Sequence, residues 1–185
     1  DAKNVSLAAN GYGVKIEQAK LTVESRGGVV QDATFALDGE ASFAKENGGL
    51  TVRSRNVRGG LRRTGETVQA NFQADAMFLT SSKYTAEIHG LGFDGDERQM
   101  HLSVQSAMLN ESMSKHLPGL QVERVDVYAQ KKADSDAIGR LSLELGAASG
   151  QIGEVAITAK TDGGQRIKLY VDASSETVTE AALIM

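Results

Sequence analysis

The sequence predicts an all-β fold, an antiparallel meander of about a dozen short strands. Apolar and polar residues alternate through most of the chain, which is the period of a strand with one dry face and one wet face. Gly-Gly, Asn-Gly and Asp-Gly pairs recur between the alternating runs and supply the positive φ angles of tight reversals. The 20 Gly and the single Pro also agree with many short connections between paired strands.

The alternation begins at Val5, and the chain is expected to reverse at Asn10-Gly11. The apolar phase then changes between Ile16 and Ala19, which predicts a bulge at the two residues between them. Gly27-Gly28 is expected to form the next turn. These signals predict paired strands from the first residues onward.

A third reversal is predicted at Asp38-Gly39. Centring a hairpin on this turn places Leu37 opposite Ala41 and Phe35 opposite Phe43, so that apolar residues meet on one face. Residues 46–49, with the sequence ENGG, predict another reversal.

The longest unbroken alternation covers residues 68–78. A further hairpin centred on Gly95 would place Ile88 opposite Leu102. The pattern lapses after this hairpin, and residues 108–117 fit one or two helical turns that end at Pro118-Gly119.

The clearest hairpin is predicted over residues 155–173, around a turn centred on Gly163. Its register brings together three apolar pairs: Ala159 with Ile167, Ile157 with Leu169, and Val155 with Val171. We take the 185 residues as a single β-rich domain. Because the chain ends on apolar residues 181–185, we also expect it to be a fragment of a longer protein.

Charge and composition narrow the function. The net charge of −4 gives no reason to expect nucleic acid as a partner. No apolar run is long enough for a transmembrane segment, and the absence of Cys excludes disulfides and Cys nucleophiles. No catalytic motif is present, so we expect no enzyme activity and no cofactor.

Two groups of polar residues could have a function. A basic cluster could bind phosphate or a lipid headgroup, or it could simply be a solvated strand face: Arg53, Arg55, Arg58, Arg62 and Arg63. In the register predicted around Gly95, His89 faces His101, and two imidazoles could share a metal. The sequence places no third ligand beside them, so we expect surface histidines and no metal site.

In texture the chain resembles the AsmA/TamB-like envelope proteins of Gram-negative bacteria. The resemblance rests on repeated apolar-polar strands joined by Gly-rich turns, for example residues 68–76 (VQANFQADA) and 138–146 (IGRLSLELG). It implies a long curled antiparallel sheet with an apolar inner trough in the periplasm. It also implies lipid passage or support of outer-membrane assembly, without catalytic residues. Lipid or acyl chains and other envelope proteins would be the partners.

The apolar face of such a sheet could be an open groove for acyl chains or the filled core of a sandwich or open barrel. A sandwich would favour the rival function, an adhesion or interaction domain that binds a protein or glycan through its loops. The predicted groove residues are Phe35, Leu37, Phe43, Phe72, Ile88, Leu102, Ile157, Ile167, Leu169 and Val171.

Overall fold

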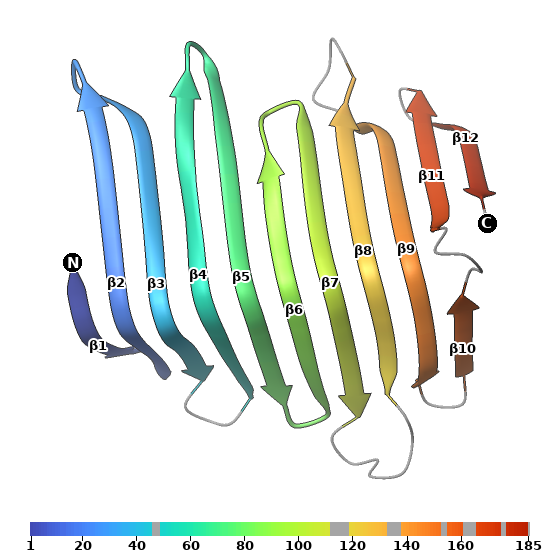
Figure 1. Cartoon of the computed structure of the whole chain (residues 1–185), viewed down its shortest axis with the longest axis horizontal. Coiled ribbons are helices and arrows are strands. Elements are labelled where there is room, and N and C mark those ends of the chain that lie inside the picture. The colour runs from blue at the N-terminus through green and yellow to red at the C-terminus, as the bar shows by residue number, and fades with distance from the viewer. Residues whose placement is uncertain are drawn as a thin grey trace.

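The computed structural model describes residues 1–45, 49–111, 119–132, 138–152, 155–160, 166–174 and 177–184. These residues form one 12-stranded antiparallel sheet that is not closed into a barrel (Figure 1). The prediction of an all-β meander is therefore confirmed. The sheet is a single layer, without the second sheet that a sandwich would place over its apolar face in the described part of the chain (Figure 1).

Most strands are long, and they follow one another along the sheet. Their bounds are β1 Ala2–Ala9, β2 Tyr12–Arg26, β3 Val29–Lys45, β4 Leu50–Thr64, β5 Thr67–Ser81, β6 Tyr84–Gly95, β7 Gln99–Glu111, β8 Leu120–Lys131, β9 Ile138–Ile152, β10 Val155–Lys160, β11 Ile167–Ser174 and β12 Thr177–Ile184. From β1 to β9 each strand pairs with the next strand of the sequence. This order needs only short connections.

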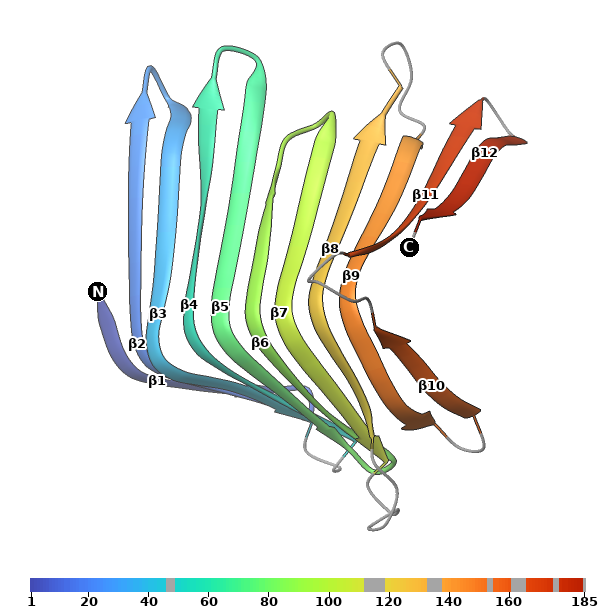
Figure 2. The ribbon, with the colours of Figure 1, turned by 45° about the vertical axis from the view of Figure 1, so that its right-hand side comes forward.

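The predicted hairpin around Gly163 is wrong. β10 pairs with β9 through Ala159↔Ala148, and β11 pairs with the other half of β9 through Ile167↔Leu145. β10 and β11 therefore lie end to end along one edge of β9 (Figure 2). β9 has the same alternation of apolar and polar residues as β10 and β11. Each of these two strands can therefore pair its apolar residues with those of β9 as well as with those of the other strand.

The expected turns have mixed outcomes. The reversals at Asn10-Gly11 and Gly27-Gly28 are confirmed, with positive φ angles at all four residues. At Asp38-Gly39 the prediction is wrong, because β3 runs through both residues as one strand. Gly39 has the expected positive φ of 81°, but the chain uses it for a bulge between Leu37 and Glu40.

The hairpin near Gly95 forms with a different register. β6 and β7 pair through Gly95↔Met100 and Phe93↔Leu102, so Leu102 does not lie opposite Ile88. The turn lies beyond Gly95, where the Asp96 backbone N–H donates to the carbonyl of Gln99 at 2.8 Å. The segment expected to be helical over 108–117 is strand β7 as far as Glu111. Residues 112–118 lie outside the described residues.

A crease crosses the whole sheet at one level, and all the long strands bend there (Figure 2). Positive φ angles mark it at Asn4, Gly39, Asn56, Gly90 and Arg124, which lie on five different strands. Non-Gly residues rarely adopt a positive φ angle. Because this conformation recurs at one level on several strands, the bend is a regular feature of the sheet. The crease divides the sheet into an upper arm and a lower arm, as they are drawn in Figure 1.

The crease also reverses the side-chain alternation, since a left-handed residue breaks the two-residue period of an extended strand. On β4, Val57 lies opposite Ala74 above the crease, whereas Val52 lies opposite Leu79 below it. The bulge predicted between Ile16 and Ala19 is confirmed and is the same event on β2. Polar residues on the crease are exposed, for example Asn56, whereas apolar residues beside it are buried.

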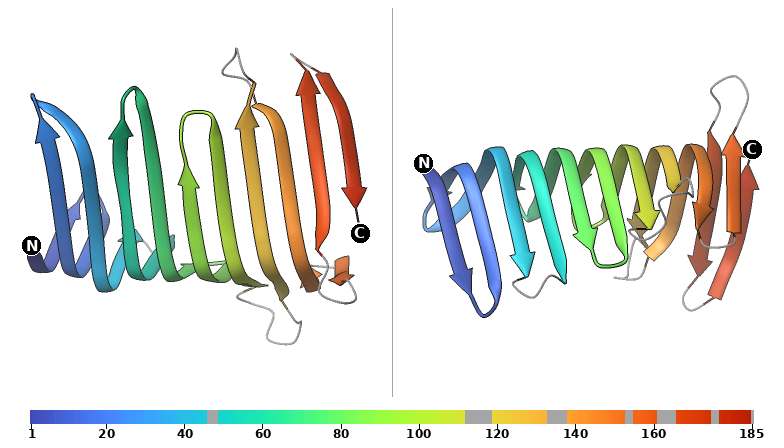
Figure 3. Two further views of the ribbon diagram at one scale, coloured as in Figure 1. Left: turned by 45° about the horizontal axis from the view of Figure 1, so that its top comes forward. Right: turned by 90° about the horizontal axis from the view of Figure 1, so that it is seen from below.

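This difference in exposure locates the apolar face. Asn4, Glu17 and Asp75 on the crease face solvent, while Val57, Ala74 and Ala148 beside it are only 5%, 2% and 7% exposed. At a bend, side chains on the outer side diverge into solvent and those on the inner side converge. The sheet arches from end to end (Figure 3), and we take the face that carries Val57, Ala74 and Ala148 as its inner side, although Ala76 on the other face is also only 6% exposed.

Candidate functional site: an apolar trough

The inner face of the upper arm consists of three apolar rows that cross the strands. Residues opposite each other in the ladders share a face, so each row can be followed from strand to strand. The row next to the crease is Ala19, Leu37, Val57, Ala74, Leu91, Val104, Val125, Leu145 and Ile167. The middle row is Leu21, Phe35, Gly59, Phe72, Phe93, Leu102, Val127, Leu143 and Leu169. The outermost row is Val23, Ala33, Leu61, Ala70, Gly95, Met100, Ala129 and Leu141.

The lower arm adds two rows on the same side of the crease. The first is Val5, Ile16, Ala41, Ser54, Met77, Ile88, Ala107, Val122, Ala148 and Ala159. The second is Leu7, Val14, Phe43, Val52, Leu79, Ala86, Leu109 and Leu120. We call these five rows the trough. As traced through the described residues, they contain no charged side chain, and Ser54 is their one polar side chain.

The trough is open to solvent. Leu21 and Leu61 expose 68% and 51% of their surface, and Leu102, in the middle of the sheet, exposes 39%. The accessible surface of the chain is 12637 Å², whereas a compact monomer of 19.6 kDa should expose only about 8,600 Å². Soluble monomers rarely expose apolar patches larger than a few hundred Å². The trough thus leaves more apolar surface exposed than soluble monomers usually do.

Most of the predicted groove residues lie in the trough. Phe35, Phe72, Leu102 and Leu169 share its middle row, and Leu37 and Ile167 lie in the row beside the crease. Phe43 and Ile88 lie on the lower arm. For Ile157 and Val171 the structure gives only the backbone pairing, with Gly150 and Leu141 respectively, and their side chains lie outside the described residues.

Sequence reasoning missed Phe93, which lies between Phe72 and Leu102 in the middle row. The alternation of Leu91 and Phe93 after Ile88 breaks phase at Gly90, so a single strand did not account for all three residues. A Gly with apolar residues two positions before it and one position after it is the signal that would have found it.

Gly59 is the gap in the middle row, and Phe35 fills it. A Cβ atom at Gly59 would lie only 2.6 Å from Cε1 of Phe35 and 2.8 Å from the carbonyl oxygen of Asn71. Real Cβ contacts are longer, so only Gly lets the ring lie over this backbone. The trough therefore presents the Phe35 ring across two strands.

The five arginines of the predicted basic cluster do not form one site. Arg53 and Arg55 lie over the Phe78 ring, with 5.8 and 5.5 Å between each guanidinium carbon and the ring centroid. Arg62 pairs with Asp32 at 2.9 Å and Arg58 with Asp38 at 3.8 Å. Nε of Arg63 donates to the carbonyl of Gly65 at the turn. The alternation over residues 68–78 breaks here, because Phe78 joins this polar outer face and not the trough.

His89 and His101 are not opposite each other, so the predicted histidine pair is wrong. His89 lies opposite Ser106 and contacts Glu87 at 2.6 Å. His101 belongs to a polar network on the outer face of the upper arm. The structure forms no group of three or more metal-ligating side chains suited to a metal ion among the described residues.

The network around His101 joins four strands of the sheet, β6 to β9, and Arg166, which directly precedes β11. Its Nε2 lies 2.9 Å from Asp126 on β8, its Nδ1 lies 3.2 Å from Asp94 on β6, and its ring stacks on Tyr128 at 4.3 Å. Asp126 also accepts from Arg166, which lies 3.5 Å from Glu144 on β9. Burial raises the pKa of Asp126, but the hydrogen bonds from His101 and Arg166 outweigh burial and hold this pKa below its ordinary value.

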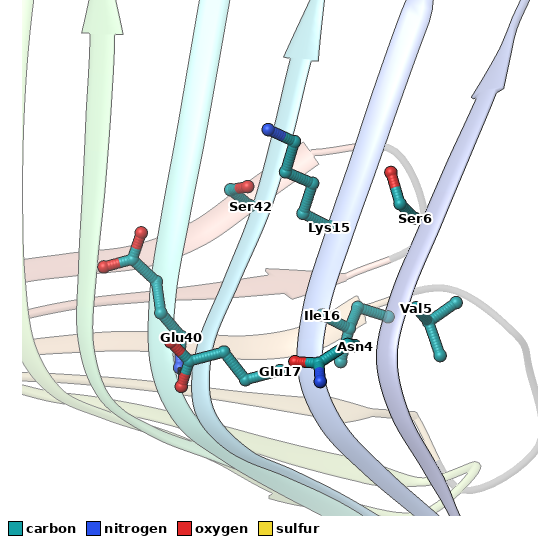
Figure 4. Close-up of a pocket in the computed structure, with 8 residues that line it drawn as sticks. All are labelled: Asn4, Val5, Ser6, Lys15, Ile16, Glu17, Glu40 and Ser42. Carbon is teal, nitrogen blue, oxygen red and sulfur yellow. Dashed lines mark hydrogen bonds between the residues drawn. The ribbon is translucent and has the colours of Figure 1, made fainter.

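A shallow hollow of about 310 Å³ lies at the crease over β1, β2 and β3, and its lining includes Val5 and Ile16 of the trough beside polar residues (Figure 4). Glu17 reaches from β2 to accept from the backbone N–H of Glu40 on β3, at 3.0 Å. Lys15 and Ser42 lie beside them (Figure 4). These contacts tie the strands together at the bend, which is a structural role.

Comparisons with protein-family models, with curated proteins and with solved structures find no match for this chain. Within the described ranges, no helix is long and apolar enough to cross a membrane. The trough is therefore interpreted from its own geometry and chemistry.

Proposed function

We propose that this chain is a non-catalytic module whose trough holds the acyl chains of lipids. The observation that carries the proposal is the trough, whose middle row runs from β2 to β11 without a charged side chain in the described part of the chain. Neighbouring strands lie about 4.8 Å apart, so the eight steps of the middle row from β2 to β11 span roughly 38 Å. That length exceeds an extended fatty acyl chain.

The physical chemistry of the trough supports an apolar ligand. Covering apolar surface gains about 25 cal/mol per Å², and the side chains from Leu21 to Leu169 in the middle row offer a continuous track of it. The track has no charge to desolvate, so an acyl chain would lose no polar contact on entering. The polar headgroup would remain at the open side of the arch.

The resemblance to AsmA/TamB-like proteins suggests where such a module works. We propose a periplasmic or otherwise extracytoplasmic location in a bacterial envelope. Lipid passage along the trough, or support of outer-membrane assembly together with other envelope proteins, would be its role. Arg53 and Arg55 lie on the outer face, so binding of anionic groups by the basic cluster stays a separate prediction.

The test is a pair of variants on neighbouring residues of β5. Phe72→Glu places a charge in the middle row, whereas Gln73→Glu places the same charge on the exposed outer face. Binding of a fluorescent fatty acid, measured by titration, should weaken at least tenfold for Phe72→Glu, because burying an unpaired carboxylate is costly.

The Gln73→Glu variant should bind the fatty acid like the unmodified chain. Circular dichroism of both variants checks that the sheet remains folded. Equal binding by the two folded variants would contradict the proposal, as would a folded unmodified chain that takes up no fatty acid.

A further inference from the structure

At each end of the sheet, one arm extends one strand further than the other, and the longer arm is not the same at the two ends. At the first end, β1 pairs only with Tyr12–Ala19 of β2, so residues 20–26 of β2 pair with β3 on one edge and with no strand of the described part of the chain on the other. The lower arm therefore extends one strand further than the upper arm there (Figure 2).

At the second end the relation is inverted. The lower arm ends with β10, which pairs with Ala147–Ile152 of β9. The upper arm continues from β9 through β11 to β12. The upper arm therefore extends one strand further at this end (Figure 1).

The strand directions at the two ends are also complementary. Every pairing in the sheet is antiparallel, so direction alternates along the strand order. Following that order, β12 runs opposite to β2, and β10 runs opposite to β1. A copy placed beside the second end would thus present β2 to β12 and β1 to β10, both in the antiparallel sense that the sheet already uses.

We propose that a second copy of this chain docks head to tail at this stepped end, adding its β1 and β2 to β10 and β12. The lower step of one copy fills the space left by the upper step of the other. The trough of one copy then continues into the trough of the next. The contact is heterologous, so it can repeat and extend the array.

The exposure of apolar side chains on β1 and β2 supports a second copy of the chain as the partner. The most exposed large apolar side chains of the described residues are Leu21 at 68% and Leu7 at 63%, followed by Val23 and Leu61 at 51%. Three of these four lie on β1 and β2, at the edge that the second copy would cover. Edge strands also leave unpaired backbone N–H and C=O groups, which another strand can satisfy and an acyl chain cannot.

Row continuity gives the register of the contact. On the outer face of the lower arm one transverse row begins with Ser6 on β1 and ends with Thr158 on β10, beside Ser149 of β9. In the docked pair, Ser6 of one copy would follow Thr158 of the other in the same row. Opposite side chains on antiparallel strands lie about 4.5–5.5 Å apart, which a disulfide can bridge with a small adjustment.

The chain has no Cys, so introduced thiols report this contact directly. Ser6 and Thr158 are both exposed. Two single variants, Ser6→Cys and Thr158→Cys, are mixed in equal amounts and oxidised, with a mass tag on one of them. The mixed disulfide dimer should be the main product, and the double variant Ser6→Cys/Thr158→Cys should form a ladder of linked multimers. Sedimentation of the unmodified chain should show a mass that rises with concentration.

The control pairs Ser6→Cys with Glu123→Cys. Glu123 is also exposed, but β8 is flanked by β7 and β9, where Glu123 pairs with Ser106 and Ala147. No copy can reach it through an edge contact, so this pair should give no mixed disulfide dimer as its main product. A folded unmodified chain that sediments as a monomer at every concentration would overturn the proposal. So would linking of the control as strong as that of Ser6→Cys with Thr158→Cys. The proposal does not depend on which ligand fills the trough.

Discussion

At the scale of single residues, Asp126 is the one charged residue that is buried in the described part of the chain. Its side chain is 13% exposed and accepts hydrogen bonds from both His101 and Arg166. Asp94, the other carboxylate on His101, is 73% exposed on its side chain. Both partners of His101 are acceptors, so both contacts are hydrogen bonds only when the ring carries two protons.

We predict that Asp126→Asn lowers the free energy of unfolding by roughly 1 to 2 kcal/mol at pH 7, because the Arg166 guanidinium and the His101 ring lose their carboxylate acceptor. The matched variant Asp94→Asn should change it by less than about 0.5 kcal/mol, since this contact is exposed. Urea denaturation measures both. Equal losses for the two variants would contradict the assignment.

The stability difference between the unmodified chain and Asp126→Asn should also depend on pH. The pKa of Asp126 is lowered in the folded state from its ordinary value of 3.8. A lowered pKa adds stability above the unfolded value, and this stability is lost as pH falls through the folded value. The gap in urea midpoint between the unmodified chain and Asp126→Asn should therefore be full at pH 7 and shrink below about pH 4. A gap that stays constant or widens in acid would refute this reading.

At the scale of elements, the crease requires an unfavourable backbone conformation in several strands. Arg124 holds a φ of 52° where β8 crosses it, and its side chain lies beside Gly146 of β9. An L-residue in this conformation costs about 1–2 kcal/mol relative to a right-handed one, and Gly escapes the cost. The bend is thus maintained against local preference by the pairing on both sides.

Substitution at Arg124 tests this strain. Arg124→Gly and Arg124→Val remove the same guanidinium, but we expect the Gly variant to be more stable by about 1–2 kcal/mol, because Val resists a positive φ. At the neighbouring Glu123, where φ is not positive, the order should reverse, since Val suits an extended strand better than Gly. Urea denaturation of the four variants gives both comparisons. The same order at both positions would rule out a strained crease.

Local chemistry predicted the turns that need two consecutive positive φ angles, such as Asn10-Gly11 and Gly27-Gly28. It did not predict Asp38-Gly39, because a single left-handed residue can serve a turn or a bulge equally well. Which one forms depends on pairing with β2 and β4, to which β3 is bound on both edges. That information is not local.

The partner of β10 was unpredictable for a related reason. Ala159 pairs with Ala148 of β9. In the predicted hairpin it would have paired with Ile167, which is also apolar. Where every row is aliphatic, period two fixes the face of a strand but not its neighbour. The crease left a readable trace in the three-residue spacings Ile16 to Ala19 and Val122 to Val125. The unbroken run over 68–78 concealed it on β5.

At the scale of the whole molecule, one layer of strands cannot bury its own apolar face. The exposed area of 12637 Å² is about half as much again as expected for a compact monomer of this mass. The described part of the chain supplies no second layer, so the stability of the arch depends on what covers the trough. A ligand that binds only the folded form adds to the free energy of unfolding by mass action.

Native mass spectrometry of the purified chain, followed by extraction and identification of whatever it carries, tests the central claim most directly. The account predicts folded protein with added masses that dissociate as acyl-bearing lipids, and loss of these masses in Phe72→Glu but not in Gln73→Glu. Folded protein without any bound acyl species, and unable to acquire one from added lipid, would contradict it.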